Sequence, residues 1–255
     1  MLIVSKKNKG IPIIDCWYAE HALAMDGVIR YQESEKPIGA RPEKFETLLS
    51  DLKEDEETIL SHYSKNCRYE VRRAPKEGVV CAAKCGKEIT EQDILTFTDF
   101  FEQFWASKGI SYNEKEKCRA MMRQYAAAGA MALTTASIGE KLLVYHTYIL
   151  DKQRVRLYQS ASQFRTDESI TTKIVGFANR YLHYQDMLFF KNVGKEQYDW
   201  GGAGKAEDVE SITKFKESFG GEPAVFYNGE EVRGAMPKLY HAAAGLVGRL
   251  TGGKD

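Results

Sequence analysis

Apolar residues recur at helical spacing most clearly between residues 94 and 105. Thr90 followed by Asp93 is typical of a capping box at a helix start, and Gly109 is typical of a helix end. The pattern therefore predicts a helix between Thr90 and Gly109 whose aromatic stripe packs into a core. The residues of that stripe are Ile94, Leu95, Phe97, Phe100, Phe101, Phe104 and Trp105.

Similar patterns predict the other elements. Pro42, suited to a first helical position, and Pro75, placed after a helical run, predict helices over 42–55 and 56–73. Further helices are expected over 113–128, 170–193, 208–219 and 237–250. Strands are expected over 79–83, 130–137, 141–150, 154–160, 197–200 and 224–227.

From residue 79 onward the expected order is strand, helix, helix, three strands, helix, strand, helix and strand. The middle strands are antiparallel, and one long helix crosses between the later two. This order predicts an α+β fold, in which helices cover a mixed antiparallel and parallel α/β sheet.

Composition narrows the class of protein. The 255 residues include 43% hydrophobic and 28% charged residues, as in ordinary soluble globular proteins. The formal net charge is zero, so no overall field draws the protein to nucleic acid or to an anionic membrane. The five cysteines are irregularly spaced and expected to be reduced thiols, and no apolar run approaches a membrane span. We therefore expect a cytoplasmic protein without a transmembrane segment.

Several enzyme classes lack their usual sequence support. The chain contains no Gly-x-Ser-x-Gly, no Walker loop, no His-Glu-x-x-His and no dinucleotide fingerprint. Serine hydrolases, P-loop kinases and zinc peptidases are therefore disfavoured.

The most specific motif runs from Arg180 to Gly202. It reads R-Y-L-H-Y-Q-D-M-L-F-F-K-N-V-G-K-E-Q-Y-D-W-G-G, which predicts a helix, a glycine stop and a short strand ending in an acidic residue and two glycines. In open α/β sheets, ligands lie at such strand ends. A second motif, I-T-K-F-K-E-S-F-G-G, follows at residues 212–221.

Together the two motifs resemble segments of GNAT-superfamily acyltransferases. The first, preceded by Asn179, is similar to N-x-x-L-H-W … K-x-x-G-x-x-Y-D-x-G-G, and the second to F-K-x-x-F-G-G, both from the branch related to Fem-type peptidoglycan-bridge aminoacyltransferases. The resemblance covers residues 78–227. It implies a GNAT-like acyltransferase domain over 78–255, with residues 1–77 as an N-terminal segment packed on it as a partial lobe.

The resemblance also implies an activity. The protein is expected to be an N-acyltransferase that uses acyl-CoA as co-substrate and needs no metal. The acceptor would be a small-molecule amine, such as that of an amino sugar or amino acid in cell-envelope or polysaccharide assembly. Because acyl transfer to an amine requires the ammonium to lose a proton, the chain should carry a proton acceptor near the acceptor site.

Three residues are the candidates for proton handling. Asp199 ends the strand of the first motif, although an aspartate beside glycines also caps backbone turns. His183 and Asp186 are three residues apart on one helix and are expected to meet on one face. His146 shares a strand face with Tyr148. Core packing is the alternative for both histidines.

Other residues are candidates for binding. Under the resemblance, Arg165 and the helix start at Ser169 and Ile170 address the phosphates of the donor. Lys216 and Arg180 are assigned to the acceptor, with Asp186 and Tyr148 as further substrate-binding candidates. Tyr198 alternates with Asp199, so it is expected to face the other side of the sheet and to lie in the core.

Two alternatives remain open. The glycine-rich loop that opens the long helix in GNAT enzymes is replaced here by S-A-S-Q-F-R-T-D-E-S. A Fem-type transferase would instead take its acyl group from aminoacyl-tRNA, which predicts a local basic track on the surface. The other alternative is a non-catalytic binding protein on a GNAT scaffold, because a fold does not fix a function.

Overall fold

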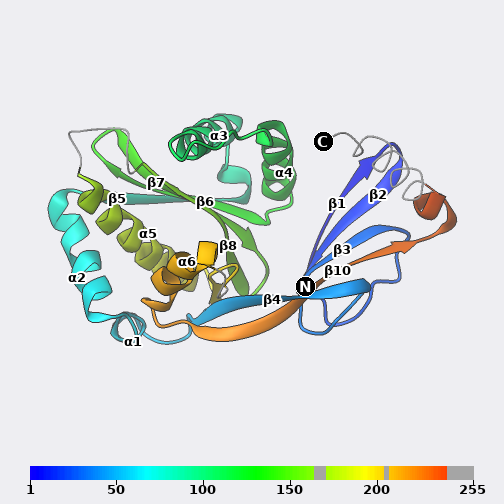
Figure 1. Cartoon of the computed structure of the whole chain (residues 1–255), viewed down its shortest axis with the longest axis horizontal. Coiled ribbons are helices and arrows are strands. Elements are labelled where there is room, and N and C mark those ends of the chain that lie inside the picture. Colours follow the sequence, from blue (N-terminus) through cyan, green and yellow to red (C-terminus); the bar gives the residue numbers. More distant parts are fainter. Residues whose placement is uncertain (164–170, 204–206, 240–255) are drawn as a thin grey trace. The chain divides into compact units, whose positions relative to one another are not determined.

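The computed structural model describes residues 1–163, 171–203 and 207–239, and it divides the chain into two compact units (Figure 1). The first unit comprises Met1–Glu46 together with residues 225–239, and the second is Thr47–Ala224. The chain passes from the first unit to the second within β4 (Ala40–Asp51) and returns within β10 (Glu222–Arg233).

The first unit is built from strands. β1 (Leu2–Asn8) and β2 (Ile11–Trp17) pair antiparallel, β2 and β3 (Gly27–Ser34) pair parallel, and β10 pairs antiparallel with β3. Alternate residues of these strands enter a small core that includes Ile14, Cys16, Ile29 and Tyr31. The sequence reasoning did not predict β1, β2 or β3.

The second unit contains a mixed sheet in the order β4-β9-β8-β7-β6-β5. Neighbouring strands are antiparallel except β8 and β9, which are parallel. The strands are β5 (Val80–Cys85), β6 (Met131–Ile138), β7 (Lys141–Leu150), β8 (Arg154–Ser162) and β9 (Gln197–Asp199). The predicted fold class, a mixed sheet covered by helices, is confirmed.

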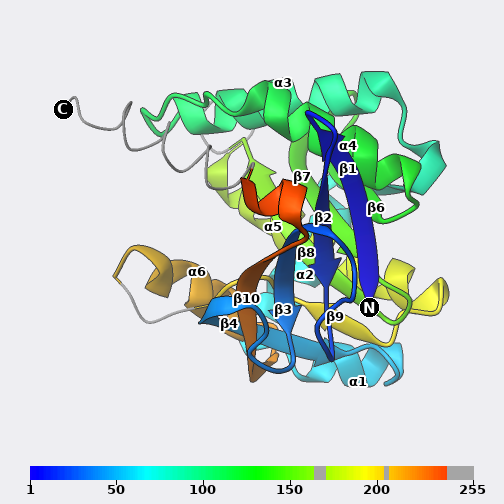
Figure 2. The same ribbon diagram turned by 90° about the vertical axis from the view of Figure 1, so that its right-hand side faces the viewer.

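Helices cover both faces of this sheet. α3 (Glu91–Ala106) and α4 (Lys115–Ala127) lie on one face, and α5 (Thr172–Asn192) lies on the other with α2 (Lys65–Arg73) packed against it (Figures 1 and 2). The remaining helical elements are α1 (Glu56–Ser61), the 3-10 turns Ala74–Glu77 and Gly86–Glu88, and α6 (Glu207–Glu217). Among the described residues, no helix combines the length and apolar character needed to cross a membrane.

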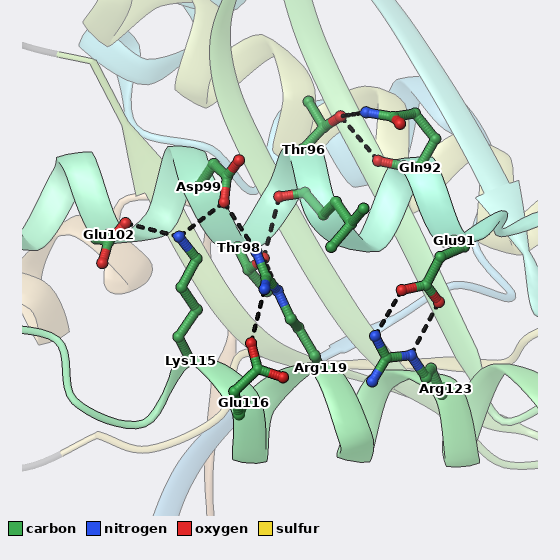
Figure 3. Close-up of polar contacts among 11 residues, drawn as sticks. Glu91, Gln92, Thr96, Thr98, Asp99, Glu102, Lys115, Glu116, Arg119 and Arg123 are labelled. Carbon is green, nitrogen blue, oxygen red and sulfur yellow. Dashed lines mark hydrogen bonds and ion pairs between the residues drawn. The ribbon is translucent and has the colours of Figure 1, made fainter.

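The predicted helix after Thr90 is confirmed, including its cap. The Thr90 hydroxyl accepts from the Asp93 amide, and the Asp93 carboxylate accepts from the Thr90 amide. On the outer side, ion pairs join α3 to α4 (Figure 3). Arg123 pairs with Glu91, and both Lys115 and Arg119 pair with Asp99.

Two expectations for the first third of the chain are wrong. Residues 42–55 do not form a helix, because β4 pairs with β9 from Leu49 opposite Asp199 to Asp51 opposite Gln197. That pairing outweighs local helical preference. The single helix expected over 56–73 is two helices, since Ser64 accepts from the Cys67 amide and starts α2 anew.

The boundary expected at residues 77 and 78 falls inside the second unit. α1, α2 and the connection between them supply Ile59, Tyr63, Cys67 and Val71 to the same core as Trp200. The segment that lies outside this unit is instead the first 46 residues together with the chain after Ala224. Most of the helix expected over 237–250 lies outside the described residues.

Candidate active site

A cavity of about 440 Å³ lies in the second unit, beside β8. β8 and β9 pair in parallel only as far as Arg156 and Asp199, where β9 ends. β8 continues to Ser162, and Leu157 and Ser160 line the cavity with it. The cavity therefore borders a stretch of strand edge that β9 leaves unpaired.

The walls combine apolar surface with a few charged and polar groups, as ligand sites generally do. α5, α6, α2 and the end of α3 contribute the side chains that face β8. The apolar ones are Phe104, Leu157, Ile212 and Phe215. The charged and most polar ones are Glu70, Lys108, Asn179, Arg180, His183 and Lys216.

His183 is the titratable wall residue with the most perturbed environment. It belongs to the buried stripe of α5, whose helix starts where the Thr171 hydroxyl accepts from the Ile174 amide. Its imidazole stacks on His146 with ring centroids 4.0 Å apart, and its Nδ1 lies 2.9 Å from the Tyr198 hydroxyl. Burial lowers the pKa of His183 well below its usual value, and electrostatic interactions with His146, Lys216 and Arg180 lower it further. The ring is therefore neutral at pH 7.

A chain of buried polar groups continues from Tyr198. The Tyr198 and Tyr148 hydroxyl oxygens are 2.9 Å apart, and the Tyr148 hydroxyl donates to Asp186 Oδ2 at 2.5 Å. His146 Nδ1 lies 2.8 Å from the same carboxylate oxygen, and its Nε2 lies 2.9 Å from Asn179 Oδ1. Burial is the main reason why the pKa values of both tyrosines lie well above their usual value, so both hydroxyls keep their protons.

His183 and Asp186 meet on one face of α5, as their spacing predicts, with ligand-type atoms within 4.8 Å of one another. The hydrogen bonds of the Asp186 carboxylate come from β7, namely from Tyr148 and His146. The expected neighbourhood of His146 and Tyr148 is confirmed, with Tyr148 Oη 3.2 Å from His146 Nδ1.

His146, His183 and Asp186 are also the residues of the described chain that could hold a metal ion. Their ligand-type atoms lie within 4.8 Å of one another. Hydrogen bonds to Tyr198, Tyr148 and Asn179 already engage these side chains. A metal ion would have to displace those bonds, so the donor set fits a hydrogen-bonded network better than a metal centre.

Two of the cationic side chains that line the cavity, Lys216 and Arg180, are held by other protein groups. The buried Lys216 ammonium donates to the carbonyls of Gly201 and Gly202, the latter at 2.6 Å. Arg180 donates to Glu70 at 2.6 Å and to Ser218 at 2.8 Å, and its guanidinium lies 4.6 Å from the Phe215 ring centre. Both side chains are thus held in place before any ligand arrives.

Asp199 lies on the other face of β9. Its Oδ1 accepts from the Thr47 hydroxyl at 2.6 Å and from the Gly201 amide at 2.9 Å, while Oδ2 lies 3.8 Å from Arg154. It is fully buried and does not line the cavity. In the structure, Asp199 therefore has the contacts of the turn-capping role that was its alternative.

Tyr198 is the residue whose part in the site the sequence reasoning missed. Alternation correctly placed it opposite Asp199, but that face was taken to be purely apolar core. The helix that covers this face, α5, carries His183, and a tyrosine facing a histidine indicates a polar contact there. The donor candidates Arg165, Ser169 and Ile170 lie outside the described residues.

A second concave region lies along α2 and the turn after it. This basic groove has a volume of about 410 Å³ and is lined by Lys65, Arg68, Tyr69, Arg72, Arg73 and Lys76. Arg73 pairs with Glu77, whereas Tyr69 is exposed. The groove concentrates positive charge locally in a chain whose formal net charge is zero.

Residues 61–168 match the family model of the acetyltransferase (GNAT) domain. No curated protein matches the chain significantly in sequence. The fold resembles that of FemX, with a TM-score of 0.57 and 12% identity over 71% of this chain and 61% of FemX. The chain thus spans less than two thirds of the length of FemX.

Two further solved structures resemble the chain. The C-terminal domain of a putative lysylphosphatidylglycerol synthetase from Agrobacterium fabrum has a TM-score of 0.54 and 12% identity, over 96% of this chain and 85% of that domain. L-PGS from Bacillus licheniformis has a TM-score of 0.50 and 11% identity, over 84% of this chain and 70% of that one.

The match and the similar structures agree on one class of protein. The chain has a GNAT acyltransferase fold. Its structural neighbours include FemX and the C-terminal domain of a putative lysylphosphatidylglycerol synthetase, so the predicted resemblance to Fem-like GNAT proteins holds for the fold.

Proposed function

We propose that this protein is an N-acyltransferase that moves an acyl group from an activated donor to an amine bound in the cavity beside β8. The observation that carries the proposal is His183, a buried and neutral histidine that lines this cavity. A neutral imidazole can accept the proton that the amine must lose, whereas an imidazolium cannot.

The step itself balances simply. The amine nitrogen attacks the acyl carbonyl carbon, the bond from that carbon to the leaving group breaks, and one amine proton passes to His183. With acyl-CoA as donor, the leaving group is the thiolate of coenzyme A. The wall residues bring the two reactants together, and such positioning alone lowers the barrier considerably.

The unpaired edge of β8 beyond Arg156 supports an extended donor with amide groups, because exposed strand edges pair with such chains. Coenzyme A has this character. Lys216 and Arg180 then face the acceptor and favour one with electron-rich oxygens, such as an amino sugar or an amino acid. The acceptor is a small molecule under this proposal, and no metal takes part.

Ligand-dependent unfolding tests the donor. A panel of acyl-CoA thioesters is added and the unfolding midpoint is measured, since a ligand at about 100 times its dissociation constant adds roughly 2.7 kcal/mol of stability. A shift for one acyl chain length, followed by thiol release when an amine is added, supports the proposal. A shift without thiol release for any amine indicates a non-catalytic binding protein instead.

The basic groove favours a second candidate, transfer from aminoacyl-tRNA. Its five cationic side chains could contact phosphates, and Tyr69 offers an exposed ring for stacking. Under this candidate the groove holds the tRNA, and the cavity holds the aminoacyl group and the amine.

Binding of tRNA at several salt concentrations separates the two candidates. If tRNA is the donor, Arg72→Glu together with Lys76→Glu should weaken binding at least about tenfold and flatten its salt dependence. Lys117→Glu, an exposed charge reversal on α4 away from the groove, is the control. Equal weakening by both changes would count against the groove.

A further inference from the structure

The two ring nitrogens of His183 have different surroundings. Nδ1 lies 2.9 Å from the Tyr198 hydroxyl, while Nε2 has no hydrogen-bond partner among the described residues. If His183 is the base, its Nε2 must be free of a proton. The position of the single proton on the neutral ring therefore decides whether the residue can act.

The hydrogen-bond chain beyond Tyr198 determines that position. The carboxylate of Asp186 can only accept hydrogen bonds, so the single hydroxyl proton of Tyr148 is donated to Asp186. Tyr148 therefore cannot donate to Tyr198, and the bond between the two hydroxyls must be donated by Tyr198. Because the hydroxyl proton of Tyr198 is already donated to Tyr148, the hydrogen bond between Tyr198 and His183 must be donated by Nδ1–H of His183.

We infer that Tyr198, Tyr148 and Asp186 are positioning residues that hold His183 as the Nδ1–H tautomer and leave the Nε2 lone pair available to the amine. This assignment of roles rests on the proposed function, whereas the tautomer does not. Asp186 begins the chain although its hydrogen bonds are to the β7 side chains Tyr148 and His146 and not to His183.

The chain also acts once the proton has been transferred. The amine N–H bond breaks, the proton binds Nε2, and Nδ1–H continues to donate to Tyr198. A carboxylate at Asp186 favours the new imidazolium, because opposite charges attract. Burial and the interactions with His146, Lys216 and Arg180 disfavour it. The site thus contains an acidic group that offsets part of the cost of charging His183.

A purely structural role for the tyrosines predicts something different. If their hydroxyls only satisfied buried polar groups, removing the Tyr148 hydroxyl would leave the proton of His183 where it was. Under the inference, Tyr148→Phe frees the Tyr198 proton from its partner. Tyr198 then donates to Nδ1, and His183 changes to the Nε2–H tautomer without any direct contact with residue 148.

Side-chain nitrogen NMR of uniformly ¹⁵N-histidine-labelled protein near pH 7 tests this directly. Signals of His183 are identified by their loss in His183→Gln. We expect a protonated Nδ1 and an unprotonated Nε2 in the unaltered protein, and the reverse in Tyr148→Phe. Tyr145→Phe is the matched control, because Tyr145 is a buried tyrosine on the same strand whose ring packs against Phe97 and Phe100. It should leave the tautomer unchanged.

Two outcomes overturn the inference: a protonated Nε2 on His183 in the unaltered protein, or an unchanged tautomer in folded Tyr148→Phe. The first needs no variant, so a misfolded Tyr148→Phe does not leave the question open. If acyl transfer is found, kcat of Tyr148→Phe should fall at least about tenfold with little change in KM. If no transfer is found but the tautomer is as inferred, only the proposed function fails.

Discussion

Tyr198 and Asp199 are neighbours in β9 and both fully buried, yet they serve two different regions of the molecule. Tyr198 faces α5 and joins His183 to Tyr148. Asp199 faces the other way and joins the Gly201 amide to Thr47. One side of the strand thus connects to the cavity wall, and the other fixes the backbone turn that follows.

The comparison shows that burial and charge do not by themselves mark a catalytic group. Asp199 is a buried carboxylate at a strand end, but its contacts are with Thr47, the turn at Gly201 and Arg154. Asp186 is a buried carboxylate of the same kind, and its contacts lead through two tyrosines to a histidine in the cavity wall. What separates them is the connection to a ligand-accessible group.

The largest effect is expected from removing the proposed proton acceptor on the cavity side of β9. His183→Gln should lower kcat by about 100- to 10,000-fold, because it removes the proton acceptor while keeping a polar side chain. Steady-state transfer kinetics measure this, with His62→Gln, an exposed histidine outside the cavity, as control. Full activity in folded His183→Gln would show that the cavity side of β9 is not the catalytic side.

On the other side of β9, replacing Asp199 should lower the stability of the protein. Asp199→Ala removes the acceptor for Thr47 and Gly201 and leaves the half-buried Arg154 without this carboxylate, so the free energy of unfolding should fall by about 3 kcal/mol. Urea unfolding measures it, with the exposed Glu140→Ala as control. Loss of turnover with unchanged stability would give Asp199 a chemical role after all.

The turn after Asp199 offers a finer test. Gly201 and Gly139 have nearly equal positive φ values of 58° and 56°. A Cβ at Gly201 would lie 2.3 Å from the Leu157 carbonyl oxygen, whereas one at Gly139 would meet nothing within 4 Å. Gly139→Ala should therefore cost about 1 kcal/mol of stability from backbone strain. Gly201→Ala should cost at least about 1 kcal/mol more, because the carbonyl must move. Equal costs would mean that the turn accommodates the methyl group.

The last test concerns the pH dependence of stability. The pKa of His183 is lower in the folded state than in the unfolded chain, where it is about 6.5. As pH falls below about 6.5 the unfolded chain binds this proton first, so stability is complete above that pH and declines below it, by at most about 1.4 kcal/mol per pH unit. Urea unfolding from pH 7.5 to 5 should show a shallower decline in His183→Gln. Identical curves would mean that His183 is not held neutral.

Much of the second unit could be predicted from sequence because its signals are local. The stripe after Thr90 and its capping box fix α3, and the alternation around residues 141–150 fixes β7. For the candidate site, the sequence indicated several of the residues but not the hydrogen bonds between them. His183, Asp186, His146 and Tyr148 do gather, but which donor meets which acceptor depends on the distance between α5 and the sheet. The spacing of residues along the sequence does not give that distance.

Two of the remaining errors share one cause. The sequence predicts a helix where β4 lies, because the partner of β4, β9, is about 150 residues away and local spacing gives no information about it. The same holds for β3 of the first unit. β3 is completed by β10, and Val28 pairs with Val232.

That last pairing has a consequence for how the protein is made. A ribosome releases β1, β2 and β3 early, but β10 emerges only after the whole of the second unit has been synthesised. Contacts so distant in sequence form slowly, because a long loop must close first. The second unit can therefore begin to fold during translation, while the nascent first unit waits with one edge of β3 unpaired. Until β10 has been synthesised, the unpaired edge of β3 is therefore open to pairing with other strands.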